Sequence, residues 1–131
     1  MDQRASSWSL TAVLAADRQD HVYLAGDALE GSKVFVFDGE TIAECSPPSD
    51  LLRGRRFTAL LVDAEDHLHA ATDGVGVLGY DGATWREHPI NEDLPTVAGT
   101  GLKPVTCMTF DRAGNLWVGM DNNVICWRDE E

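Results

Sequence analysis

Short apolar segments separated by polar turns recur along the chain. Three of them, at Leu10–Leu14, Phe57–Leu61 and Val105–Phe110, consist of β-branched and large apolar residues and have about the length of a buried strand. An Asp, a tight turn and a second apolar segment follow each of the three. No stretch has the period of an amphipathic helix, and we expect at most one helical turn, at Ser49–Arg53. The pattern therefore predicts an all-β protein.

The segments form an internal repeat. Thr11, Thr58 and Thr106 recur at intervals of 47 and 48 residues. Each unit continues into a third strand, and in the first two units an Asp-Gly turn, the strongest short hairpin signal, leads to a fourth. A period of about 40 to 50 residues with short strands is typical of β-propellers. We therefore predict three four-stranded antiparallel propeller blades in one domain. The expected bounds are 1–131 for the domain and about 10–47, 57–90 and 105–131 for the blades.

The third unit ends after its third strand, and the N-terminus has a spare strand. Residues 1–9, with Trp8, resemble the fourth strand around Trp85, so we expect them to supply the closing outer strand. Propellers typically have about four to eight blades, so three blades do not close by themselves. We expect ring closure by homo-oligomerisation, with six blades in a dimer or nine in a trimer. A fragment of a longer propeller would have the same strands and the same incomplete end.

Two runs resemble a known family. Phe110–Gly119 resembles the repeat of the two-component-regulator propellers, whose pattern is Asp-x-x-Gly-x-Leu-Trp-Val-Gly-Thr, and Thr72–Trp85 resembles the rest of that repeat. The first unit departs from the pattern, with Tyr23 where the third has Trp117. The resemblance implies a propeller fold and a general binding role. In the family these blades form extracytoplasmic sensor or scaffold domains of larger signalling proteins. This sequence contains no kinase, receiver or membrane segment, so the sensing role does not carry over.

The charge of the chain disfavours nucleic acid as a partner. The formal net charge is −12, and the one basic cluster is Arg53, Arg55 and Arg56, whereas nucleic-acid affinity needs clustered Lys and Arg. That cluster is either a solvated loop between units or a contact for an acidic partner. The three cysteines form no CxxC pair, and neither a signal peptide nor a membrane span is visible. We therefore expect a cytoplasmic protein with no membrane partner.

The histidines and aspartates are weighed as candidate metal or catalytic groups. His67 and His69 share one face of a strand, which makes a metal site conceivable. Their positions in the repeat instead indicate a turn exit and a packing position, so we predict no metal site and no cofactor. Asp17, Asp63 and Asp111 recur in every unit, and we expect them to cap turns, because an active site is needed only once.

The tryptophans offer the clearest binding clue. We expect Trp8 and Trp85 to pack between sheets and Trp117 within the core, which leaves Trp127 as the exposed one. Our prediction is a non-enzymatic propeller binding or scaffold module for a protein or glycan ligand, without catalytic residues. Two alternatives stay open: a lectin with inter-blade sites, and a propeller enzyme of the lyase or hydrolase type. The candidate binding residues are Trp127, His67, His69, Arg55 and Arg56.

Overall fold

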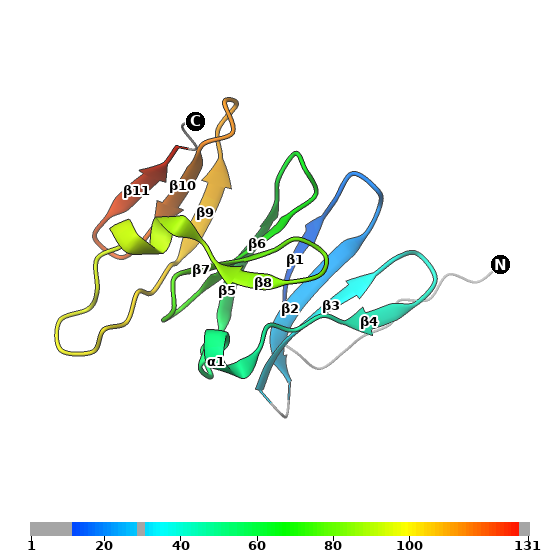
Figure 1. The fold of residues 1–131 in the computed structure, drawn as a ribbon, viewed down its shortest axis with the longest axis horizontal. Coiled ribbons are helices and arrows are strands. Elements are labelled where there is room, and N and C mark those ends of the chain that lie inside the picture. The colour runs from blue at the N-terminus through cyan, green and yellow to red at the C-terminus, as the bar shows by residue number, and fades with distance from the viewer. Residues whose placement is uncertain (1–11, 29–30, 129–131) are drawn as a thin grey trace.

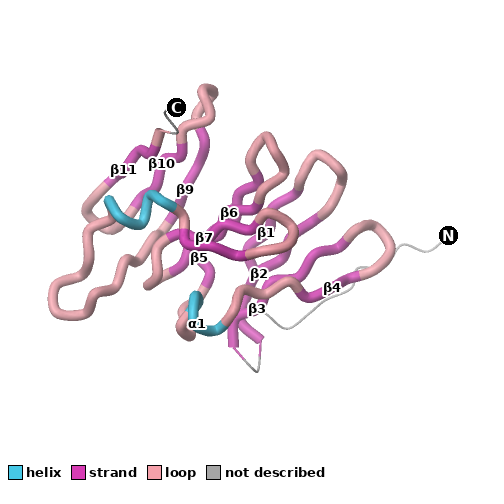
Figure 2. The backbone as a smooth tube through the Cα atoms, viewed as in Figure 1, coloured by secondary structure: helices cyan, strands magenta, loops and turns pink. Residues whose placement is uncertain are grey.

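The computed structural model describes residues 12–28 and 31–128 of the chain. They form three antiparallel sheets side by side, with little helix, as Figures 1 and 2 show. The predicted all-β fold is therefore confirmed. The predicted closing strand over residues 1–9 lies outside the described residues. Within the described ranges, no helix has the length and apolar character needed to cross a membrane.

The first unit is a four-stranded meander in the order β1-β2-β3-β4. Successive side chains along each strand lie on opposite faces of the sheet. The strands are β1 (Ala12–Ala16), β2 (Val22–Ala28), β3 (Gly31–Phe37) and β4 (Ile42–Glu44). A one-turn helix, α1 (Ser49–Leu52), follows in the connection to the second unit, as predicted.

The second unit repeats this meander in the order β5-β6-β7-β8. Its strands are β5 (Phe57–Val62), β6 (Leu68–Thr72), β7 (Val77–Tyr80) and β8 (Trp85–Glu87). β7 starts later than the apolar pattern suggests, because the Thr72 hydroxyl donates to the Gly76 carbonyl at 2.8 Å and closes a turn before the strand. Gly76 has a φ of 73°, which few other residues adopt.

The third unit has three strands among the described residues, in the order β11-β10-β9. A 3-10 helix, η1 (Pro89–Asp93), and an extended loop lead into it. The strands are β9 (Cys107–Phe110), β10 (Leu116–Gly119) and β11 (Val124–Trp127). The sequence thus predicted the three strands that the structure describes in this unit.

The sheets pack face to face, with one apolar core between each pair of neighbours. β1 contacts β5, and β5 contacts β9, so the first strands of the units lie next to one another. The core between the first and second units includes Tyr23, Leu60 and Trp85, and the core between the second and third includes Val77 and Leu116. Stacked meanders with their first strands innermost are the architecture of propeller blades.

Trp85 packs between sheets, as predicted, whereas Trp117 does not lie in the core. Trp85 is buried, and its indole N–H donates to the Cys45 carbonyl at 2.7 Å. Trp117 is exposed, because its side chain lies on the face of the third unit that no other sheet of the described residues covers. The expectation for Trp117 was therefore wrong. The expectation that Trp127 is the exposed tryptophan was wrong too, because Trp127 is partly buried against the core between the second and third units.

The strand pairing shifts the alignment of the first unit by one residue. Leu14 pairs with Leu24, and Leu60 pairs with Ala70 in the equivalent place. Leu14 therefore corresponds to Leu60, although the apolar runs alone align Val13 with Leu60. A register irregularity between Phe57 and Ala59 accounts for the displaced residue.

Candidate functional site: a cleft beside the first turns

The turn between the first and second strands has the same construction in each unit. In the second unit, the Asp63 Oδ1 accepts hydrogen bonds from the amides of Glu65 and His67, at 2.9 and 3.0 Å. Asp17 and Asp111 accept the equivalent pairs of amide bonds in their own units. The predicted turn-capping role of the three aspartates is therefore confirmed. Capping leaves the second carboxylate oxygen of each Asp available for a side chain.

The three turns point to the same side of the molecule (Figure 1). They border a cleft of about 430 Å³. All three units contribute to its lining. The side chains that matter for binding come from the second and third units: Asp63, His69, His88, Phe110, Asp111 and Trp127. A cleft of this size, with aromatic walls and a few polar groups, has the form of small-molecule sites in general.

Asp63 and His69 form the polar centre of the cleft. The Oδ2 of Asp63 lies 2.8 Å from the His69 Nε2 and 4.0 Å from the His67 Nδ1. Burial favours the neutral acid, but the hydrogen bonds from His69 and from the amides outweigh it and hold the Asp63 pKa below its ordinary value. Because the carboxylate needs a donor, the His69 Nε2 carries the proton. The His69 Nδ1 is buried and has no hydrogen-bond partner among the described residues.

His88 is a neutral histidine held by the backbone. Its Nδ1 accepts a hydrogen bond from the Ile90 amide at 3.0 Å and so caps η1. Burial, followed by the charge of a protonated His69, lowers the pKa of His88 to about 4, with Asp63 acting in the opposite direction. At neutral pH the ring therefore carries its proton on Nε2, which is then available to a ligand as a hydrogen-bond donor.

Aromatic rings join the second and third units at the cleft. His69 meets the ring of Phe110 edge-on, with ring centroids 5.3 Å apart, and His88 meets Trp127 edge-on at 4.7 Å. His69 and His88 are themselves 5.4 Å apart. Edge-to-face packing of this kind fixes the orientation of each ring. The wall of the cleft is thus a continuous row of four rings.

The charges that line the cleft are mostly negative. Hydrogen bonds from the Trp117 indole and the Asn115 amide lower the Asp111 pKa to about 2, so this carboxylate is ionised at neutral pH. Asp17 also has a lowered pKa, because hydrogen bonds from His21 and the Gln19 amide outweigh the opposing effect of burial. The carboxylates in the lining are Asp17, Asp63, Glu65 and Asp111, and the cations are Arg18 and Arg112.

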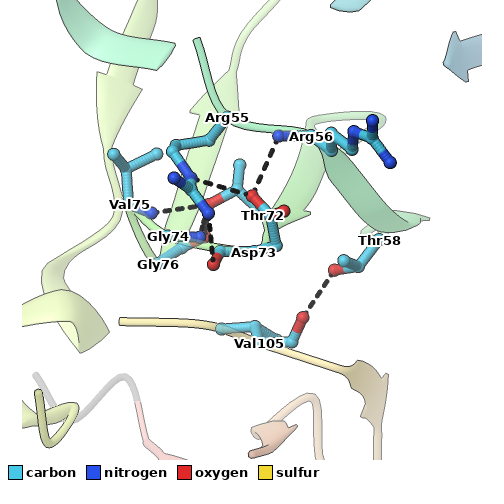
Figure 3. Close-up of polar contacts among 9 residues, drawn as sticks. All are labelled: Arg55, Arg56, Thr58, Thr72, Asp73, Gly74, Val75, Gly76 and Val105. Atoms are coloured by element: carbon cyan, nitrogen blue, oxygen red, sulfur yellow. Dashed lines mark hydrogen bonds and ion pairs between the residues drawn. The ribbon is translucent and has the colours of Figure 1, made fainter. Parts of the chain in front are cut away.

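The two arginines among the predicted binding residues lie elsewhere. Arg55 and Arg56 precede β5, at the end of this strand remote from Asp63. Figure 3 shows the Arg55 Nε donating to the Asp73 Oδ1 at 3.0 Å, and the Arg56 amide donating to the same oxygen at 2.9 Å. The Arg55 side chain also fills the space that a Cβ on Gly74 would occupy. Arg55 therefore has a structural contact within its own unit.

The remaining predicted residues gather around the second unit. The structure brings His69 and Trp127 into one cleft through His88. His67 borders a second hollow of about 360 Å³, which His69 and His88 also line. Sequence reasoning missed the role of Asp63 as the partner of His69. The signal for it was present, because His69 and Trp117 follow their turn aspartates at the same spacing and both bind them. In the described part of the chain, no group of three His, Cys, Asp or Glu side chains converges as a metal site would require.

Comparison with known proteins agrees with the fold. Residues 101–122, which include β9, its turn and β10, match the model of the two component regulator propeller family. No curated protein matches the chain.

A solved structure is similar over the whole chain. It is the extracellular domain of a protein assigned as a one-component system from B. thetaiotaomicron, with 18% identity and a TM-score of 0.66. The match covers 100% of this chain but only 17% of that one. The likeness establishes a β-propeller-type fold for the three sheets. A cytoplasmic location for this chain stays a prediction.

Proposed function

We propose that this chain is a non-enzymatic β-propeller binding module whose ligand occupies the cleft beside the first turns. The observation that carries the proposal is the row of rings from Phe110 to Trp127 next to the Asp63–His69 pair. Binding residues concentrate on loops that a rigid scaffold positions, and the three Asp-capped turns provide such loops. The matched family repeat is a regulatory propeller repeat, which agrees with a role in recognition.

The lining favours ligands that are neutral or positively charged. The lining contains four carboxylates and two arginines, so an anion such as a phosphate would meet net repulsion. Hydroxyl and ammonium groups are the natural donors to ionised Asp63 and Asp111. We infer a small polar ligand that has one apolar face for the aromatic wall.

A carbohydrate is the more specific candidate within this class. Trp127 lies in an inter-blade cleft together with ionised carboxylates, which is the combination of an apolar platform and hydrogen-bond acceptors that a sugar ring uses. A catalytic function has less support. The described lining contains no Ser, Thr, Cys or Lys that the Asp63–His69 pair could activate as a nucleophile.

The test is calorimetric titration of the full chain with three sets of probes: neutral mono- and disaccharides, cationic amines, and sugar phosphates. We expect binding of a neutral or cationic probe. Trp127→Ala removes the aromatic platform and should weaken that binding by about tenfold or more, which corresponds to about 1.4 kcal/mol. Arg56→Ala, at the remote end of β5, is the matched control and should leave the affinity unchanged.

The same titration distinguishes the two groups of predicted binding residues. Binding that survives Trp127→Ala but is lost in Arg56→Ala would place the site at the Arg55–Arg56 end and contradict the proposal. Binding of the sugar phosphates alone would contradict it as well, because the cleft carries net negative charge.

A further inference from the structure

Among the residues that the structure describes, the first and third units each have one sheet face without a neighbouring sheet. Side chains of directly paired residues share a face, so the register defines both surfaces. The front face of the first unit comprises Leu14, Val22, Leu24, Phe35 and Phe37. The back face of the third unit comprises Cys107, Thr109, Trp117, Val124 and Cys126. Both faces are largely apolar, although they lie at the two ends of the stack.

The back face of the third unit has the character of an interface that occurs twice inside the chain. Val34, Val77 and Val124 occupy equivalent positions on the third strands of the three units. Their partners on the second strands are the equivalent residues Ala25, Ala71 and Gly119. Val34 and Val77 are 0% exposed because the next unit covers them, whereas Val124 is 71% exposed. An exposed valine at a position that is otherwise buried indicates a missing neighbour.

Trp117 supports the same conclusion. Its equivalents are Tyr23, which is 7% exposed against the second unit, and His69, which packs on Phe110 of the third. Trp117 is 38% exposed, and its indole N–H is fixed by the Asp111 Oδ2 at 2.9 Å. The Trp117 indole is therefore held in place on an uncovered face. In the other two units, the equivalent side chain contacts the next sheet.

The front face of the first unit is the complementary surface. Leu60, on the face of the second unit that packs against the first, is 6% exposed, and its equivalent Leu14 is 61% exposed. Phe37 pairs with Ile42, which is 43% exposed. The equivalent pair in the second unit is Tyr80 and Trp85, whose rings stack. The exposed front face of the first unit thus corresponds to the face of the second unit that packs against a neighbour.

We propose that the back face of the third unit binds the front face of the first unit of a second copy of this chain. One chain carries both halves of the contact, and each half has the same kind of surface as the two inter-unit cores already formed. In the new interface, the first unit of the second copy packs on the third unit as each unit packs on the one before it within the chain. It rests on the register and the exposed side chains, and it is independent of the proposed ligand cleft.

Two copies complete a ring of six units with two such contacts related by a two-fold axis. Six lies within the usual range of about four to eight propeller blades, whereas three copies would give nine. Closure removes both apolar end faces from water at once. A head-to-tail contact that did not close would instead leave one apolar face at each end and produce filaments.

The experiment measures the solution mass of the full chain by light scattering, for the wild type and three variants. We expect a wild-type mass near twice 14.3 kDa. Leu14→Asp and Val124→Asp each bury a carboxylate in both contacts and should reduce the mass to that of a single chain. Both residues are exposed in the isolated chain, so the fold should tolerate either change, and circular dichroism verifies this. Val97→Asp, on the loop before the third unit and 47% exposed, is the matched control and should stay dimeric.

Three results would overturn the proposal. A wild-type chain that is a monomer would mean that blades of another polypeptide, and not a second copy, cover the faces. A dimer that only one of the two variants disrupts would indicate contact between like faces. A dimer that resists both variants would place the interface elsewhere.

Discussion

At the scale of single residues, the turn aspartates combine two tasks. One carboxylate oxygen caps the turn, and the other holds a side chain, which is His21 in the first unit, His69 in the second and Trp117 in the third. Charge-assisted hydrogen bonds of this kind are stronger than neutral ones. In the second and third units, the Asp thereby fixes the orientation of a side chain on the back face of the sheet. That face meets the next unit in the second unit and is uncovered among the described residues in the third. In the second unit the same device places His69 in the cleft.

Because His88 is buried and neutral in the folded chain, we expect the free energy of unfolding to depend on pH. Burial lowers its pKa from 6.5 to about 4. Between these values the unfolded state binds a proton that the folded state does not, so the free energy of unfolding decreases as the pH falls from 6.5 to about 4. With allowance for solvent screening, we expect this group to account for about 1–2 kcal/mol of the decrease.

His88→Asn is the matched variant for this effect. Asn keeps a side-chain acceptor for the Ile90 amide but does not titrate. Urea denaturation at pH 7 and pH 4 should show a smaller difference in stability between the two conditions for the variant than for the wild type. An equal difference would mean that His88 does not retain its neutral form in the folded protein.

At the scale of the elements, η1 is anchored to the second sheet by one buried amide. The Asn91 Oδ1 accepts from the Val77 amide at 2.8 Å, and its Nδ2 donates to the Val77 carbonyl at 2.9 Å and to the Val75 carbonyl at 3.4 Å. Asn91 thereby pairs the outer edge of β7 where β8 has ended. Gly76 is close enough that a Cβ there would collide with the Asn91 side chain.

Asn91→Ala should therefore destabilise the chain substantially. The change leaves the buried Val77 amide without its partner, while the Val77 carbonyl keeps its hydrogen bond from the His88 amide at 3.0 Å. We therefore expect a loss of about 1–3 kcal/mol in the free energy of unfolding. Asn122→Ala, in the exposed turn before β11, is the control and should change stability by less than about 0.5 kcal/mol. Urea denaturation measures both. Equal effects of the two variants would contradict this role of Asn91.

The strands could be predicted from the sequence where residues typical of turns lie between them. The Asp-Gly turns and the capping aspartates located the strands, and the single helical turn of α1 was also anticipated. The register of β1 was not, because Val13, Leu14 and Ala15 form an apolar run without the alternation that assigns a face. The cleft was predictable only in part. Trp127 and His69 were identified singly, but their meeting through His88 depends on packing between units.

At the scale of the whole molecule, three units of one design account for both the stable interior and the uncovered ends. Each unit has a face that receives a neighbour and a face that contacts the next, and the chain fulfils this twice internally. A third contact of this kind would join the back face of the third unit to the front face of the first, and a single chain does not form it among its described residues. Repeat proteins commonly need terminal units with polar outer faces for solubility, and Leu14 and Val124 depart from that rule.

The cysteines permit the most direct measurement of whether the end faces are covered. Cys107 is exposed on the back face of the third unit, whereas burial, with a smaller effect of Glu44, raises the pKa of Cys45 to about 11 and keeps its thiol unreactive at neutral pH. We would follow thiol modification by peptide mass spectrometry as the protein concentration is raised. We expect the modification rate of Cys107 to fall about tenfold or more as the ring forms, and Leu14→Asp, on the front face of the first unit, to restore it. A fast rate that is independent of both concentration and Leu14→Asp would contradict the claim that the end faces bind one another.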